Sequence, residues 1–165
     1  MDPSHRPERT REAAEAAENG MIGIFTAIYP RLVRAIEREY GPAARELAVR
    51  EFADAMMELS KASFPPADQR SLGDYKAWLC RAVPVGLEYE VQEETDSDLH
   101  FRFTACPWAQ AFRAIGEPEI GHLFCDVDEP VAAEFNRAIR FSRTKTLMDG
   151  DDHCNHHYAL VEIEE

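Results

Sequence analysis

The hydrophobic period of the chain changes near residue 86, and this change limits the folds that the chain can adopt. Before that point apolar residues recur at three- and four-residue spacing, as in 32–40, which is typical of amphipathic helices. After it, apolar and polar residues alternate over 87–92 and again over 99–106, which is typical of an antiparallel hairpin. Helices first and strands later indicate an α+β protein.

Turn and cap residues divide the chain into predicted elements. Asn19-Gly20 is predicted to end a first helix over 10–18, Gly41 to end a second over 21–40, and Pro42 to open a third. Further helices are predicted over 74–82, 107–116, 117–124 and 130–139, and further strands over 140–147 and 153–163. The predicted fold has N-terminal helices packed on a mostly antiparallel sheet of about four strands.

Length and charge limit the number of domains and the class of partner. The 165 residues suffice for one domain, expected over 13–165, after a polar segment 1–12 that is expected to be disordered. A formal charge of −13 disfavours nucleic acid and membrane surfaces, so a small molecule is the expected partner. Without an apolar run of about 20 residues the expected location is cytoplasmic, with four reduced cysteines. A homo-oligomer is compatible with this composition.

Cys106 stands where a predicted strand meets a predicted helix. Pro107 cannot continue a strand ladder but suits the first turn of a helix, so Cys106 is predicted to be the N-cap. Free amide groups and the helix dipole would favour a thiolate there, with a pKa below that of a free cysteine. Cys106 is therefore a candidate nucleophile, and a cysteine that merely fills the corner is the alternative.

Cys125 and Asp128 lie together in the segment FCDVDEP. An aspartate just before a helix near Pro130 is a common N-cap, which stabilises a helix by about 1 kcal/mol. A catalytic Asp128 would instead face a cleft shared with Cys106 and act there as acid or base.

The segment DGDDHCNHHY concentrates acidic, cysteine and histidine residues. In a strand, Cys154, His156 and Tyr158 would share one face. Cysteine and histidine two residues apart can bind one metal ion together with Cys106 or Cys125, whereas a polar strand end explains the same residues without metal. No cysteine spacing matches a compact metal motif, so no metal or other cofactor is expected. Zinc or iron held by Cys106, Cys125, Cys154 and His156 is the alternative.

Three segments carry the combination of motifs that is most specific: FTACPWAQAFRAIG, HLFCDVD and FNRAIRFSRTKTLMDGDDHCNHHY. With Cys106, the Cys-x-x-Asp pair and a Gly-Asp-Asp-x-Cys ending, residues 84–162 resemble the L-2-amino-thiazoline-4-carboxylic acid hydrolase family. The ending is also similar, more distantly, to the ligand-sensing domain related to the 4-vinyl reductases. Members of the hydrolase family usually continue Cys-Asp-x-Phe after the last cysteine, whereas Asn155 follows Cys154 here, so a different substrate is compatible with the pattern.

The resemblance implies a hydrolase that opens a small cyclic amidine or thiazoline carboxylate at a carbon–nitrogen bond. It implies catalysis by Cys106 with Asp128 as acid and base, while Cys125 and Cys154 shape the pocket or take a second role. Water activated by a bound metal is the competing mechanism. His156 and Tyr158 are expected to contact substrate, and two arginines on predicted strands, Arg102 and Arg140, are candidates for binding its carboxylate. A non-catalytic ligand-sensing domain and a metal-handling protein remain the alternative functions.

Overall fold

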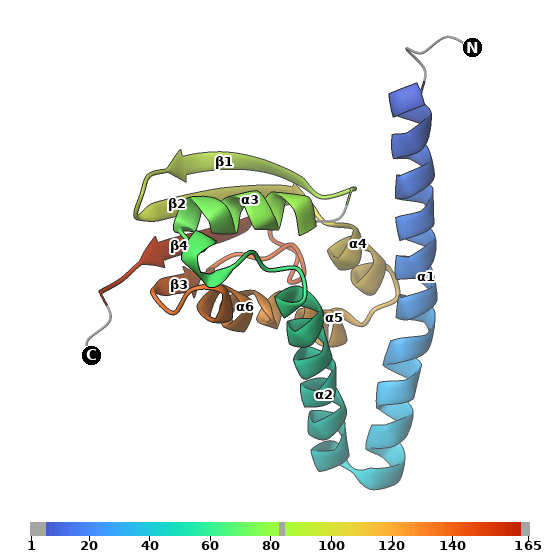
Figure 1. Ribbon diagram of the computed structural model, residues 1–165. Coiled ribbons are helices and arrows are strands. Elements are labelled where there is room, and N and C mark those ends of the chain that lie inside the picture. Colours follow the sequence, from blue (N-terminus) through green and yellow to red (C-terminus); the bar gives the residue numbers. More distant parts are fainter. Residues whose placement is uncertain (1–5, 83–84, 163–165) are drawn as a thin grey trace.

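Two long helices form an antiparallel hairpin that stands beside the sheet (Figure 1). The computed structural model describes residues 6–82 and 85–162, and the hairpin consists of α1 (Arg6–Tyr40) and α2 (Pro42–Lys61). Gly41 joins them at a φ of 83°, a conformation that glycine adopts without strain. No helix in the described part of the chain is long and apolar enough to cross a membrane.

The predicted break at Asn19-Gly20 is wrong, because α1 runs through it without interruption. A glycine inside a helix costs about 1 kcal/mol relative to alanine. Burial of Ile22 and Val33, each at most 3% exposed, on the same helix offsets this cost. Residues 6–12, which were expected to be disordered, also belong to α1, whereas residues 1–5 of that segment lie outside the described part.

The strands form one antiparallel sheet in the order β1-β2-β4-β3. They are β1 (Glu88–Glu94), β2 (Asp98–Ala105), β3 (Ile139–Ser142) and β4 (Cys154–Leu160). The predicted α+β fold with a four-stranded antiparallel sheet is thereby confirmed. The strand predicted over 140–147 already ends at Ser142, because the chain turns away to form the loop that leads to β4.

Shorter helices connect and cover these strands: α3 (Leu72–Ala82), α4 (Pro107–Ala114), α5 (Pro118–Asp126) and α6 (Asp128–Phe135), with a 3₁₀ turn at Ala67–Gln69. The helix predicted over 130–139 therefore begins two residues earlier and ends four residues earlier. Asp128 therefore lies in the first turn of α6, and Ile139 begins β3 instead of ending the helix.

Two apolar clusters hold the fold together. The first lies between the sheet, α3 and α6, and contains Tyr75, Phe101, Phe135 and Tyr158 among its fully buried side chains. The second lies between the helical hairpin, α4 and α5, and is centred on Phe112. The segments that carry the candidate cysteines run between the two clusters.

Gly121 is predicted to be the least replaceable glycine of the second cluster. A Cβ at this position of α5 would lie 2.5 Å from Met148 Sδ and 2.8 Å from Phe112 Cγ. Gly121→Ala should therefore lower the free energy of unfolding by about 1–3 kcal/mol, measured by urea denaturation. The matched control is Gly23→Ala in α1, where nothing lies within 4 Å. It should stabilise the protein by up to about 1 kcal/mol; equal effects would contradict the packing described here.

Candidate functional site

A cavity of about 450 Å³ lies where the two apolar clusters meet. Its walls come from both long helices, from α3 to α6, and from the two central strands β2 and β4. The four predicted catalytic residues all line it, and so do His156 and Tyr158; the catalytic four are Cys106, Cys125, Asp128 and Cys154. The catalytic four, which are spread over 48 positions from 106 to 154, are thus brought to one site.

Cys106 caps α4 as predicted, with φ −143° and ψ 114° and Pro107 in the first turn. The predicted fall of its pKa is wrong. Burial raises the pKa of the Cys106 thiol, and this outweighs the opposite effect of the Ala109 and Trp108 amides, while charge on Cys154 raises the pKa further. No side-chain capping hydrogen bond forms. A thiolate at Cys106 therefore requires a base or a cation close by.

Cys125 and Asp128 flank the junction of α5 and α6. Burial raises the pKa of Cys125 to about 12, so this thiol is protonated at neutral pH. Asp128 does not act as an N-cap; that position belongs to Val127, and Asp128 is the first residue of α6. Its side chain is 25% exposed toward the cavity and interacts with Arg143 instead.

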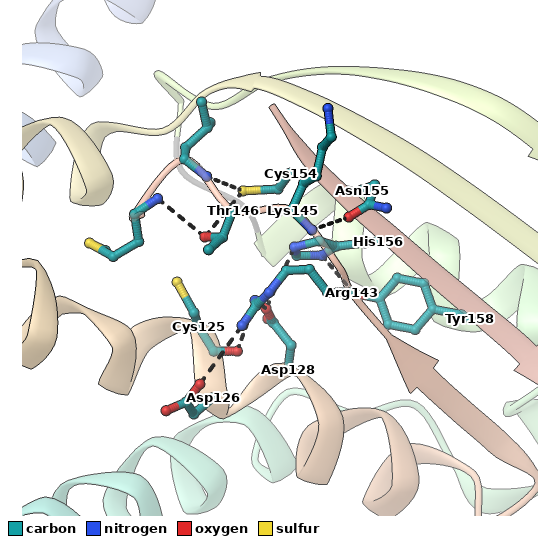
Figure 2. A network of polar contacts seen from close by, with 12 residues as sticks. Cys125, Asp126, Asp128, Arg143, Lys145, Thr146, Cys154, Asn155, His156 and Tyr158 are labelled. Carbon is teal, nitrogen blue, oxygen red and sulfur yellow. Dashed lines mark hydrogen bonds and ion pairs between the residues drawn. The ribbon is translucent and has the colours of Figure 1, made fainter. Parts of the chain in front are cut away.

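Arg143, just beyond the end of β3, is the functional candidate that the sequence reasoning missed. Its Nη1 donates to Asp128 Oδ2 at 3.1 Å and to the Cys125 carbonyl at 3.2 Å. Its Nη2 lies 3.7 Å from Asp126 Oδ1. Figure 2 shows the guanidinium extending between the two carboxylates. Periodicity could have identified Arg143 from the sequence. Residue 143 lies on the same face of the predicted strand as Phe141, which packs against the core.

The carboxyl group of Asp128 titrates close to neutral pH. Burial raises the pKa of Asp128 to about 7, and the charge of Asp126 adds to this, although Arg143 opposes both. A carboxyl group with such a pKa can both accept and donate a proton near pH 7.

Strand β4 directs alternate side chains into the cavity, as predicted for Cys154, His156 and Tyr158. The Cys154 sulfur accepts the Leu147 N–H at 3.1 Å and lies 3.7 Å from Thr146 Oγ1, which ties it to the loop before β4 (Figure 2). These contacts hold Cys154 in the wall of the cavity.

His156 is a neutral imidazole in this site. Burial, with a contribution from Arg143, lowers its pKa to about 3. Its Nδ1 lies 3.3 Å from the Tyr158 hydroxyl and its Nε2 lies 3.8 Å from Asp128 Oδ2. Burial raises the pKa of Tyr158, so its hydroxyl can donate to Nδ1. The Nε2–H of His156 then faces Asp128.

The two predicted carboxylate-binding arginines lie outside the cavity. Phe101 and Phe103 face the core, so Arg102 between them faces the other side of the sheet, where it pairs with Asp152 at 3.6 Å. Arg140 donates to the Arg137 carbonyl at 2.6 Å. Among residues 6–82 and 85–162, the arginine that lines the cavity is Arg143. Arg102 and Arg140 were chosen wrongly because each projects from the outer face of its strand.

The alternative set of metal ligands does not converge in the described residues. A metal site requires donor atoms that lie close to one another. In residues 6–82 and 85–162, the group of three residues whose donor atoms all lie within 4.8 Å of one another is Asp98, His100 and His157. The cysteines of the cavity and His156 are not part of it.

Fold and site together define an α+β protein with a mostly apolar cavity that holds thiols, a carboxyl group titrating near pH 7 and a neutral imidazole. The profile of the L-2-amino-thiazoline-4-carboxylic acid hydrolase family matches residues 19–158. The chain belongs to this family, and the match extends the resemblance from the C-terminal half into the long helices.

One solved structure with a distant sequence is similar to this chain. A crystal structure of trafficking protein particle complex subunit 3 from Naegleria fowleri, covalently bound to palmitic acid, superposes with a TM-score of 0.49 at 16% identity. The superposition covers 86% of this chain and 95% of that one. No curated protein matches the sequence significantly.

Proposed function

We propose that the protein is a cysteine-dependent hydrolase that opens a small cyclic amidine, with an aminothiazoline carboxylate as the reference substrate. The observation that carries this proposal is the raised pKa of Asp128 in a cavity that also holds the Cys106 thiol. A weakly nucleophilic buried thiol requires a base of matched pKa, and a carboxyl group of ordinary pKa would be a poor one.

The cavity suits a small cationic ring that carries a carboxylate. Its volume of about 450 Å³ lies within the usual range of ligand pockets. An amidinium group would be attracted to Asp128 and to a thiolate at Cys106, and its charge would favour that thiolate. The guanidinium of Arg143, 13% exposed, is the cation that the structure offers to the carboxylate.

The first half of the proposed reaction forms a covalent adduct. Asp128 takes the proton of the Cys106 thiol, and the sulfur adds to the carbon between ring sulfur and ring nitrogen. The electron pair of the carbon–nitrogen double bond moves onto the ring nitrogen, which already carries its proton in the amidinium form of the substrate. The ring carbon–sulfur bond then breaks, rather than the carbon–nitrogen bond that the resemblance implies, since a thiolate is the better leaving group. Asp128 returns the proton to it. Cys106 is left bonded to an isothiouronium group that retains every atom of the substrate.

The second half releases the product. Asp128 accepts a proton from water, and the oxygen adds to the isothiouronium carbon. Collapse of this tetrahedral adduct breaks its bond to Cys106, which leaves as a thiolate and recovers the proton from Asp128. The hydroxyl proton of the adduct is released to solvent as the urea carbonyl forms. The product is a carbamoyl-cysteine with a free thiol. His156 Nε2–H, next to Asp128, is placed to orient that carboxylate through both halves.

Product analysis with a panel of cyclic amidines tests this function. The panel comprises aminothiazoline, aminooxazoline and aminoimidazoline carboxylates. We expect at least one member to gain one water by mass spectrometry, and a thiazoline product to react with a thiol reagent. A product without a free thiol would show that the ring carbon–nitrogen bond breaks instead. Tight binding without turnover of any member would contradict the hydrolase and favour a ligand-sensing domain.

Replacement of Arg143 tests the proposed carboxylate contact. Arg143→Gln should raise KM for a carboxylated substrate by about 10- to 100-fold, the value of a charged hydrogen bond. The KM for the same ring without its carboxylate should change much less. Arg140→Gln is the matched control, because this arginine lies outside the cavity, and it should leave both constants unchanged. Equal effects of Arg143→Gln on the two substrates would exclude the contact.

A further inference from the structure

The strand register brings ligand-type side chains into one row on the sheet face that lies away from the cavity. His100 of β2 pairs with Glu93 of β1 on one side and with His157 of β4 on the other. Asp98 lies two residues before His100, so it projects on the same face of β2. None of these four side chains lines the cavity.

The side chains in this row already contact one another. The donor atoms of Asp98, His100 and His157 all lie within 4.8 Å of each other. His157 Nε2 is 3.1 Å from Asp98 Oδ1, and the two imidazole rings are 3.9 Å apart between centroids. Glu93 Oε2 lies 3.6 Å from His100 Nε2 and adds a second negative charge beside the rings.

We propose that Asp98, His100 and His157 form a binding site for a divalent transition-metal ion of the zinc type. Two imidazoles and a carboxylate are a common ligand set for such ions, whereas Mg²⁺ and Ca²⁺ prefer oxygen donors alone. Ligands bonded at about 2.0–2.1 Å lie closer together than 4.8 Å. Small rotations of these half-buried side chains close the gap, while three hydrogen-bonded strands fix their backbones.

The surroundings leave a coordination position for water or a small ligand. A hollow of about 200 Å³ adjoins both histidines and is lined also by Gln92, Ser142 and Asn155. Three protein ligands with an open fourth position are the arrangement that catalytic zinc sites have, whereas structural sites use four. The three ligands of this site lie outside the cavity of the proposed hydrolase, whereas Arg143 and His156 border both the hollow and that cavity.

Binding of Zn²⁺ to tag-free protein, followed by calorimetry, tests this site. We expect about one ion per chain, and at least a tenfold weaker affinity in His157→Ala and in Asp98→Asn. The matched control is His122→Ala, which removes another half-buried histidine, 2.6 Å from Asp149, on α5. It should bind like the wild type. Circular dichroism shows whether each variant is folded, and Asp98→Asn keeps the size of the side chain.

Co²⁺ spectra separate this site from the cysteines of the cavity. The wild type should give ligand-field bands without the strong near-ultraviolet bands of thiolate ligation. His100→Ala should lose the ligand-field bands. Thiolate bands that persist in the histidine variants would place the ion on the cysteines and overturn the proposal. Unchanged Zn²⁺ affinity in His157→Ala and Asp98→Asn would overturn it as well.

Discussion

Cys106→Ser is expected to lower kcat by a factor on the order of 10³ or more while substrate binding changes little. Serine keeps the N-cap position of α4 and can replace the thiol sterically. Its hydroxyl is far less acidic, so a base with a pKa of about 7 such as Asp128 cannot generate the nucleophile. Steady-state kinetics, with ligand binding measured separately, gives both quantities.

The other cysteines supply the controls for this variant. Cys80 does not line the cavity, so Cys80→Ser should retain full kcat. Cys154→Ser should lose less than Cys106→Ser, because its role is to hold the loop through Leu147 and Thr146. A Cys106→Ser enzyme with wild-type kcat would show that the nucleophile has been misassigned.

Asp128→Asn is expected to lower kcat/KM by about 10²- to 10⁴-fold. The amide keeps the shape of the side chain but cannot take the proton of Cys106. In the wild type, kcat/KM should fall below pH 7, since the base must be ionised and burial raises the pKa of Asp128 to about 7. This limb of the pH profile should vanish in Asp128→Asn. The same limb in both enzymes would assign it to another group.

Stability gives an independent view of the same carboxyl group. Its pKa is raised on folding, so the folded state favours the protonated form. The contribution of Asp128 to stability is therefore complete below its usual pKa of about 4 and is lost as the pH rises through 7. The melting temperature of the wild type should fall relative to that of Asp128→Asn between these pH values.

Sequence periodicity was sufficient for the class of the fold but not for its boundaries. The alternation of 87–92 and 99–106 became β1 and β2, because half-buried strands keep a strict period of two. Asn19-Gly20 did not end a helix, since the packing of α1 outweighs the weak local preference of one glycine. A local turn preference does not end a helix where tertiary contacts stabilise the helix on both sides of it.

The residues of the candidate site were easier to predict than their chemistry. Cys106 and Asp128 could be chosen from their places at junctions and from the resemblance, and both line the cavity. The direction in which the pKa of Cys106 shifts could not be predicted from the sequence. It is set by burial, which depends on how the two apolar clusters pack around the thiol. Arg143 was missed for a related reason: its partners Asp126 and Asp128 lie on α5 and α6, and only the fold brings these helices to the end of β3.

The residues that follow the last cysteine have separate roles, which bears on the departure from the family pattern. The Asn155 side-chain oxygen accepts hydrogen bonds from the backbone amides of Thr144 and Lys145, and these bonds fix the loop before β4. His156 and Tyr158 face the cavity. We therefore expect any difference in substrate from the named enzyme to depend on these two side chains.

Mass spectrometry of the enzyme, acid-quenched during turnover, tests the central claim most directly. The proposed mechanism predicts a chain heavier by the full mass of the substrate, with the addition mapped to the peptide that contains Cys106. The adduct should be absent from Cys106→Ser. A wild-type enzyme that turns over substrate while the adduct maps to Cys125 or Cys154, or forms at no quench time, would contradict catalysis by Cys106.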